Sequence, residues 1–315
     1  MSTWELASVL SKTLIYLGML AVAGGMLVLW MNRQHQTAVQ IIVRAYLLPV
    51  TLVGLLATCL FFLIQIGSVN QNGFAGMFDP LMGSILAETE VGAAIRWRLI
   101  GFLLALIALI PVNLPGFPFQ HLAARRFCLF VTLAALTCFV IAVTSQGHAS
   151  AVSRLAELLA GLHLLAIACW AGSLYPLYLL VGRNAGAGQF HHTEELCDTA
   201  AVLERFGFYA WWMLGLMLFT GVSLIWLLTG GLLTLFDNLH GQLLFAKILL
   251  VAGMMVLGAL HKFRWVPRLR ECAHSGADTQ AVLLALSRSI RLEMLLALLV
   301  LLLTATLTSV TGPGG

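Results

Sequence analysis

Residues 147–176 read GHASAVSRLAELLAGLHLLAIACWAGSLYP, a short polar connection followed by a long apolar run. His148 lies in the connection, Arg154 and Glu157 open the run, and His163 follows within it. If the run is helical, His163 lies about 13 Å deeper than its start. An apolar run of this length is typical of a membrane-spanning helix. An ionisable residue inside such a helix indicates a functional site, so this stretch predicts both a fold class and a first candidate residue.

The composition extends the membrane prediction to the whole chain. Of the 315 residues, 60% are hydrophobic and 10% are charged, a balance that a water-soluble globule cannot bury and that lipid can solvate. Crossing a hydrocarbon core of roughly 30 Å takes about 20 residues. Runs of that kind cover residues 10–30, 46–66, 93–112, 127–144, 155–181, 208–229, 243–262 and 290–308. We therefore expect an all-α polytopic protein with eight transmembrane helices, forming a single transmembrane domain over residues 1–315 in contact with membrane lipid.

The positions of Lys and Arg predict the orientation of the helices. Cytoplasmic connections retain basic residues during membrane insertion. Most of the 17 Lys and Arg residues fall at the odd-numbered connections between the predicted helices, whereas the even-numbered ones carry acidic residues and histidines. We therefore expect both termini on the outer, periplasmic side. The net charge of +4 is explained by this asymmetry, so no nucleic-acid partner is expected.

Recurring spacings suggest an internal repeat. Tyr16 precedes Gly24 by eight residues, and His163 precedes Ala171 by eight. Two further pairs of positions recur in the same order, namely Gly54 with Gly215 and the Gly92 to Arg98 spacing with that of Gly241 to Lys247. Such a pattern predicts two parallel four-helix repeats with halves 1–146 and 147–315. Chance recurrence of glycine in membrane helices is the alternative interpretation.

Three histidines are the first candidates for a metal site. His163 lies within a predicted helix, while His148 and His240 lie in the two short outer connections. Neutral imidazole binds copper, zinc and iron. The plainer interpretation is that His163 hydrogen-bonds a neighbouring helix and that the two loop histidines are solvated. A metal entry site requires that the three side chains converge.

Methionines supply a second class of candidate ligand. Thioethers are soft ligands suited to Cu(I). Met77 and Met82 lie in the longest outer connection, and Met213 and Met217 share a face of the sixth predicted helix. Methionines in membrane helices more often serve as packing residues, so we keep both interpretations open.

Several charged residues lie near or inside the predicted helix ends. Arg98 and Lys247 lie one to two turns inside the outer boundary, where they either anchor at the interface or pair with acidic residues and line a water-filled vestibule. Arg154 and Glu157 are three residues apart, so we expect a local ion pair that covers His163. Glu293 lies just inside the inner end of the last helix, and we expect an interfacial pair with Arg291.

Sequence motifs of ATP-driven pumps and of nucleotide-binding proteins are absent from the sequence. It contains no phosphate-binding loop, phosphorylatable aspartate motif or dinucleotide fingerprint, so ATP-driven pumping has no support. A bis-histidine haem needs two histidines at similar depth on facing helices. Only His163 is clearly inside, since His261 lies near the opposite surface, so haem is poorly supported.

Four segments together resemble a known family. They are GHA in the outer connection, HLLAIACWAGSLYPL from His163, HGQLLFAKILLVAGMMVLGALHKFRWVP from His240, and SRSIRLEMLLALLVLLLTATLTSVTGP at the end. In this order they resemble the CopD/PcoD-type copper resistance membrane proteins. The resemblance extends over the chain and is strongest after Gly147.

The resemblance implies a multi-pass protein of the bacterial inner membrane that handles copper ions. It implies that the protein works with a periplasmic copper-binding protein of the CopC type and moves copper into the cytoplasm. The family pattern carries over to His148, His163, Trp170, Gly172, Lys247 and Glu293. The sequence contains no CopC-like domain, so we expect a separate periplasmic donor.

We accordingly expect a copper homeostasis protein that takes copper ions from the periplasm across the inner membrane, and no enzymatic activity. Two alternatives stay open. One is a membrane haem or redox protein that uses the same histidines. The other is a membrane partner of a periplasmic copper-binding protein that does not itself transport copper.

Overall fold

The structure is a computed structural model, and it describes residues 2–32, 36–70, 73–113, 122–145, 152–186, 193–229, 239–275 and 279–310. Within these ranges the regular structure is helical and contains no strand. Eight helical segments are long and apolar enough to cross a membrane. Their bounds are Thr3–Met31, Ala38–Asn70, Glu90–Val112, Leu122–Thr144, Arg154–Arg183, Leu196–Leu228, Gly241–Cys272 and Thr279–Thr308. The predicted all-α fold with eight spanning helices is confirmed.

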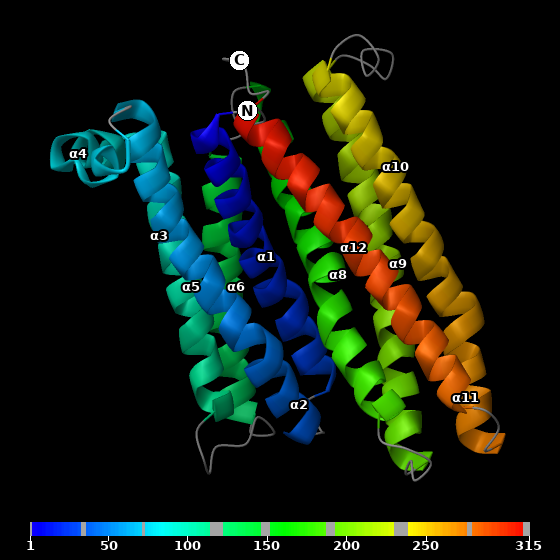
Figure 1. The fold of residues 1–315 in the computed structure, drawn as a ribbon. Helices are drawn as coiled ribbons and strands as arrows, with labels where there is room; N and C mark the ends of the chain where they lie inside the picture. Colours follow the sequence, from blue (N-terminus) through cyan, green and yellow to red (C-terminus); the bar gives the residue numbers. More distant parts are fainter. Residues whose placement is uncertain are drawn as a thin grey trace.

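The spanning helices form two groups of four that lie side by side (Figure 1). The first group is α1 (Thr3–Met31), α3 (Leu48–Asn70), α5 (Glu90–Asn113) and α6 (Leu122–Thr144). The second is α8 (Arg154–Gly186), α9 (Thr193–Thr229), α10 (Leu239–Leu260) and α12 (Thr279–Val310). The groups meet where α1 packs against α8 and α12. The division into repeat halves stays a prediction.

The two ends of the helical assembly differ. α1 begins and α12 ends at the same end, which we call the terminal end (Figure 1). The short helix α4 (Pro80–Glu88) lies there too, beside α3 and α5. The short helices α2 (Gln36–Ile42) and α11 (Val266–Ser275) lie at the opposite end, which we call the basic end because it carries most of the Lys and Arg residues. The charge pattern predicts that the terminal end is periplasmic.

Two glycines bring the groups into backbone contact. Gly24 on α1 lies against Gly172 on α8, and a Cβ atom on Gly172 would overlap the carbonyl oxygen of Leu20. Two hydrogen bonds secure the crossing. The Ser173 hydroxyl donates to the Gly24 carbonyl at 3.1 Å, and the Tyr46 hydroxyl donates to the Gly172 carbonyl at 3.0 Å. Small residues at this crossing therefore set how closely the two groups approach.

Two wide helical turns share a local cause. The π-helical turn η1 (Val43–Leu47) ends two residues before Pro49, and the π-helical turn η4 (His261–Trp265) ends two residues before Pro267. Proline has no N–H to donate to the preceding turn, and its ring crowds the carbonyl there, so the helix widens. The second of these turns begins at His261.

Candidate functional site

The side chain of His163 extends from α8 to α9. Its Nδ1 atom lies 2.9 Å from the hydroxyl oxygen of Thr220 and 3.1 Å from the carbonyl oxygen of Met217. The Thr220 hydroxyl donates its own hydrogen to the Leu216 carbonyl at 2.7 Å, so its oxygen accepts from the ring. The Met217 carbonyl can only accept. Both partners therefore favour a ring that carries its proton on Nδ1.

This arrangement leaves the other ring nitrogen for a ligand. With the proton on Nδ1, the Nε2 atom of His163 has a lone pair, and within the described residues no hydrogen bond to it occurs. Histidines that bind metals commonly donate the second ring N–H to a carbonyl or carboxylate, which fixes the tautomer and the ring orientation. The hydrogen bond from His163 to a neighbouring helix, which was the simpler of the two sequence-based interpretations, is thus present. The same hydrogen bond is the support that a metal-binding imidazole needs.

Two further groups surround the His163 ring. A Cβ atom on Gly221 would lie 3.1 Å from the ring carbon Cε1, so only glycine leaves the ring its present position. The ammonium group of Lys247 on α10 lies within electrostatic range of the ring. Lys247 is partly buried in the second helix group, as expected for a residue inside the outer boundary.

The other two histidines of the predicted entry site are not placed. His148 lies outside the described residues, and of His240 only the helical backbone at the start of α10 is described. Within the described residues no group of three His, Cys, Asp or Glu side chains is arranged to hold a metal. The convergence of His148, His163 and His240 therefore stays a prediction.

Met77 and Met82 lie beside the first helix group. Met77 lies in the turn η2 (Ala75–Phe78) and is buried, packed against Gly67 of α3. Met82 is half-buried on α4, which packs against α3 and α5. The structure thus places both thioethers beside helices of the first group, while His163 lies in the second. A role for them as ligands stays a prediction.

Asp79 organises this outer connection. Its carboxylate accepts hydrogen bonds from the backbone N–H groups of Met82 at 3.0 Å and Leu81 at 2.9 Å, and so caps the start of α4. The N–H group of Met82, followed by those of Leu81 and the Asn70 amide, lowers the pKa of Asp79 below its ordinary value.

Arg98 is buried in the first helix group. Its side chain is 3% exposed, and its guanidinium carbon lies 5.7 Å from the centre of the Phe61 ring. Lys12 on α1 also lies beside this ring, with its ammonium nitrogen 5.7 Å from the ring centre. The same ammonium group donates to the carbonyl of Thr308 at 3.0 Å. Arg98 is therefore held inside the protein and does not anchor at the interface, which corrects one of the two sequence-based interpretations.

A polar cleft opens at the terminal end, next to Lys12. Its volume is about 660 Å³, and its walls include Glu5, Ser8, Gln65 and Thr308. The pair Gln65 and Ser8 is joined by a hydrogen bond of 3.4 Å. The cleft is lined by residues of α1, α3 and α12, and neither Arg98 nor Lys247 is among them, so the predicted vestibule lined by these two residues stays a prediction.

Arg154 and Glu157 do not form the expected local pair. Arg154 is exposed, and Glu157 is partly buried with its backbone N–H bonded to the Ser153 carbonyl at 3.1 Å. Within the described residues no ion pair joins the two side chains. Their spacing permits contact, but the exposed arginine keeps its hydration, which outweighs a weak surface pair.

Glu293 is also placed differently from the prediction of an interfacial pair with Arg291. Its side chain is 1% exposed, and its Oε2 atom lies 3.2 Å from Nδ1 of His261. The Nε2 atom of His261 lies 2.7 Å from the Ser289 hydroxyl. Arg291 instead lies over the ring of Tyr178, 5.7 Å from its centre. The prediction was wrong because the helix turns Glu293 inward, towards α10, and Arg291 away from it.

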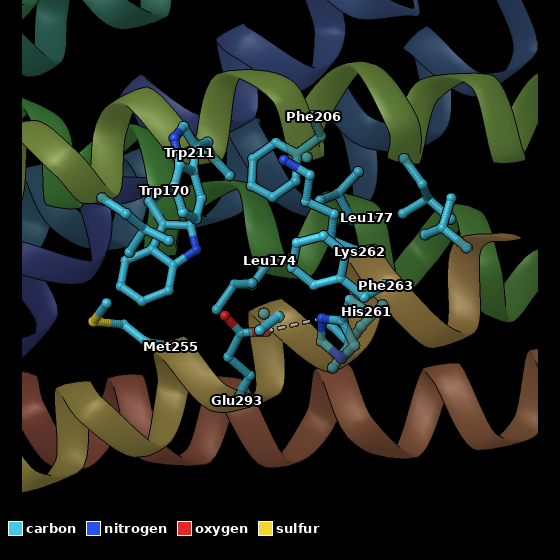
Figure 2. A pocket seen from close by; sticks show the side chains of 18 of the residues that line it. Trp170, Leu174, Leu177, Phe206, Trp211, Met255, His261, Lys262, Phe263 and Glu293 are labelled. Carbon is cyan, nitrogen blue, oxygen red and sulfur yellow. Dashed lines mark ion pairs between the residues drawn. The ribbon is translucent and has the colours of Figure 1, made fainter.

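The pair of Glu293 and His261 lies at the wall of an apolar cavity of about 170 Å³ (Figure 2). The cavity lies among α8, α9, α12 and the segment of α10 with η4. The aromatic side chains of Trp170, Phe206 and Trp211 line it, and the dashed line in Figure 2 marks the pair.

Sequence reasoning missed the residues that support these sites. Thr220 and Gly221 were not singled out, although a hydroxyl followed by glycine on a facing helix is a signal for a supported ring. His261 was treated only as a residue near the opposite surface. Its position six residues before Pro267 was the available signal, because proline disturbs the helical turn that precedes it.

Two models of one copper-related protein family match most of the chain. Residues 200–307 match the family model described as "Copper resistance protein D". Residues 1–156 match the model described as "Copper resistance protein D-like, N-terminal domain". No solved structure matches the chain.

Two curated relatives are similar in sequence. "Inner membrane protein YebZ" of Escherichia coli (strain K12) is 26% identical over 211 residues, which are 65% of this chain and 65% of the relative. "Copper transport protein CutJ" of Bacillus subtilis (strain 168) is 25% identical over 257 residues, which are 79% of this chain and 42% of the relative. The matched part is thus less than two thirds of either relative.

Proposed function

Because the chain belongs to the copper resistance protein D family, we propose that it takes copper ions from the periplasm and moves them across the inner membrane. The protein is a multi-pass inner membrane protein of a copper-related family. One of its relatives is named a copper transport protein, which supports transport as the specific role. The proposed role is that of a transporter and not of an enzyme.

One observation carries the proposal, namely the support of the His163 ring. The Thr220 hydroxyl and the Met217 carbonyl hold Nδ1 at 2.9 and 3.1 Å, which leaves Nε2 to bind a metal. Imidazole binds copper in both of its common oxidation states. A ring that is fixed before the ion arrives loses little freedom on binding, so His163 is suited to receive a copper ion.

Other residues complete the proposed path. His148, which precedes α8 in the sequence, and His240, at the start of α10, would deliver the ion to His163. Met77 and Met82 would offer a separate soft site on the first helix group. Arg98 and Lys247 are basic side chains inside the bundle, and Glu293 is a buried acidic side chain at the other end of the second group. Copper is the substrate of this path.

A periplasmic copper-binding protein of the CopC type is the proposed donor. The helix α4 and the start of α10 lie at the terminal end (Figure 1), which the charge pattern assigns to the periplasm, and His148 precedes α8 in the sequence. A donor that docks there would release its ion close to the candidate ligands. Arg154 and Glu157 at the start of α8 would lie at this docking surface.

Cellular copper content tests the proposal. In a strain that lacks the endogenous gene, the wild-type chain is expected to raise cellular copper over the vector control. The variant His163→Ala is expected to lose that increase, whereas Ser223→Ala, which alters an exposed hydroxyl on α9, is expected to retain it. Equal copper content with His163→Ala and wild type, at equal amounts of protein in the membrane, would remove His163 from the path.

A further inference from the structure

The cavity beside Glu293 opens towards lipid. Its rim includes Trp211 and Phe263, whose side chains are 62% and 70% exposed. Both residues lie in helical segments that are long and apolar enough to cross a membrane, so we expect their exposed faces to contact lipid. The inner wall of the cavity includes Trp170, which is 3% exposed, and Glu293, which is 1% exposed. A ligand can therefore enter sideways from the membrane and reach a buried carboxylate.

One oxygen of the buried Glu293 side chain has no hydrogen-bond donor among the described residues. Oε2 of Glu293 lies 3.2 Å from His261, whose other ring nitrogen is occupied by Ser289. Oε1 of Glu293 is buried and has no hydrogen-bond partner in the described part of the chain. It faces Gly258, because a Cβ atom there would lie 3.9 Å from it. A carboxylate oxygen without a donor in apolar surroundings is costly, and a ligand that supplies a donor removes that cost.

The size and walls of the cavity favour one aromatic ring. Its volume is about 170 Å³, and an engineered apolar cavity of about 150 Å³ holds benzene. Trp170, Phe206 and Trp211 border the space (Figure 2). Aromatic side chains pack well against another ring in offset or edge-on arrangements.

The positive charge of Lys262 at the mouth of the cavity decides which kind of hydrogen-bond donor a ligand can carry. Lys262 lines the cavity, and its ammonium group lies 5.3 Å from the centre of the Trp211 ring. This positive charge at the rim opposes the entry of an organic cation. A neutral hydroxyl group meets no such opposition and can donate to Oε1 of Glu293.

We propose that this cavity binds the head group of a membrane-soluble hydroquinone, with one ring hydroxyl donating to Glu293. The ring lies among Trp170, Phe206 and Trp211, and an apolar tail leaves over Trp211 and Phe263 into the bilayer. The proposal concerns binding and goes beyond copper transport. Neither its success nor its failure bears on His163, which binds α9 through Thr220.

Calorimetric titration of the full-length protein in lipid nanodiscs tests this site. The probes are 1,4-hydroquinone, kept reduced under argon, and 1,4-dimethoxybenzene, which has the same ring and no donor. Empty nanodiscs correct for partition into lipid. A hydroxyl that donates to the buried Oε1 atom of Glu293 is expected to make hydroquinone bind about tenfold more tightly than the ether. Equal affinity for the two probes, or no binding beyond that of empty nanodiscs, overturns the proposal.

Two variants locate the binding. Gly258→Leu adds a side chain beside Oε1 where the backbone has room, and it is expected to abolish hydroquinone binding. Gly215→Leu is the matched control, since a Cβ atom there meets nothing within 4 Å, and it is expected to bind like wild type. Glu293→Gln keeps the shape of the side chain and is expected to reduce the preference for hydroquinone over the ether. Unchanged binding in Gly258→Leu contradicts the assignment of the cavity.

Discussion

The Nδ1 atom of His163 lies 2.9 Å from the Thr220 hydroxyl, which donates its own hydrogen to Leu216 and therefore accepts from the ring. This contact joins α8 to α9 and determines which ring nitrogen is left for a metal. Membrane helices cannot leave polar groups without partners in lipid, so a histidine at this depth needs such support. The first prediction concerns a variant that lacks the Thr220 hydroxyl.

Thr220→Val keeps the shape of the side chain and removes the acceptor. The His163 ring is then held only by the Met217 carbonyl, and its orientation is less fixed. Loss of such outer support typically lowers metal affinity by about 10- to 100-fold. Competition between the purified protein and a copper chelator measures the affinity. Ser223→Ala on the same helix is the control, and a Thr220→Val affinity equal to that of the control would exclude a supporting role.

Gly221→Ala tests the room around the same ring. The new methyl group would lie 3.1 Å from Cε1 of His163, which is tighter than ordinary contact, so the ring must shift away from Thr220. We expect weaker copper binding in the same competition assay, with the helix itself intact by circular dichroism. Gly215→Ala adds a methyl group to α9 in open space and is expected to bind copper like wild type.

Gly172→Ala tests the crossing of the two helix groups. Its methyl group would overlap the Leu20 carbonyl and force α1 away from α8, which also stretches the bond from Ser173 to Gly24. Overpacking of this kind typically costs about 1–3 kcal/mol. Unfolding in mixed micelles measures the change. Gly182→Ala on the same helix has no atom within 4 Å of the new carbon and is the control; equal stability of the two variants would show that the crossing tolerates separation.

Asp79 makes the stability of α4, in the outer connection, depend on pH. Its pKa lies below the ordinary value of 3.8, chiefly because the backbone N–H of Met82 donates to the carboxylate. A lowered pKa in the folded state means that the cap stabilises α4 above pH 3.8 and that this contribution is lost as pH falls through the folded-state pKa.

Hydrogen exchange of the Met82 amide, expressed relative to its intrinsic rate, is therefore expected to lose protection as pH falls below 3.8. Asp79→Asn keeps a capping oxygen that does not titrate, so its protection is expected to be the same on both sides of that pH. Loss of protection in both proteins at the same pH would assign the change to another group.

Composition and hydropathy were sufficient to predict the helices. Each spanning helix satisfies its backbone hydrogen bonds internally, so an apolar run of sufficient length determines the element by itself. The charge pattern likewise placed the basic residues at one end. The recurring spacing from Tyr16 to Gly24 singled out Gly24, and the structure shows this residue at the crossing with Gly172.

Contacts between helices were not predictable in the same way. Glu293 pairs with His261 because α12 and α10 are rotated and shifted to bring those faces together, and a single sequence carries no record of that rotation. Arg154 and Glu157 had the spacing of an ion pair, but spacing does not show whether water competes for the arginine. Thr220 was overlooked because its partner lies on another helix.

Copper flux into proteoliposomes tests the central claim most directly. The protein is reconstituted with a copper-sensitive dye inside, and uptake is compared among protein-free vesicles, wild type, His163→Ala and Ser223→Ala. The account predicts flux above the protein-free level for wild type and Ser223→Ala, and a return to the protein-free level for His163→Ala. Wild-type flux no greater than that of protein-free vesicles, or His163→Ala flux equal to wild type, would contradict it.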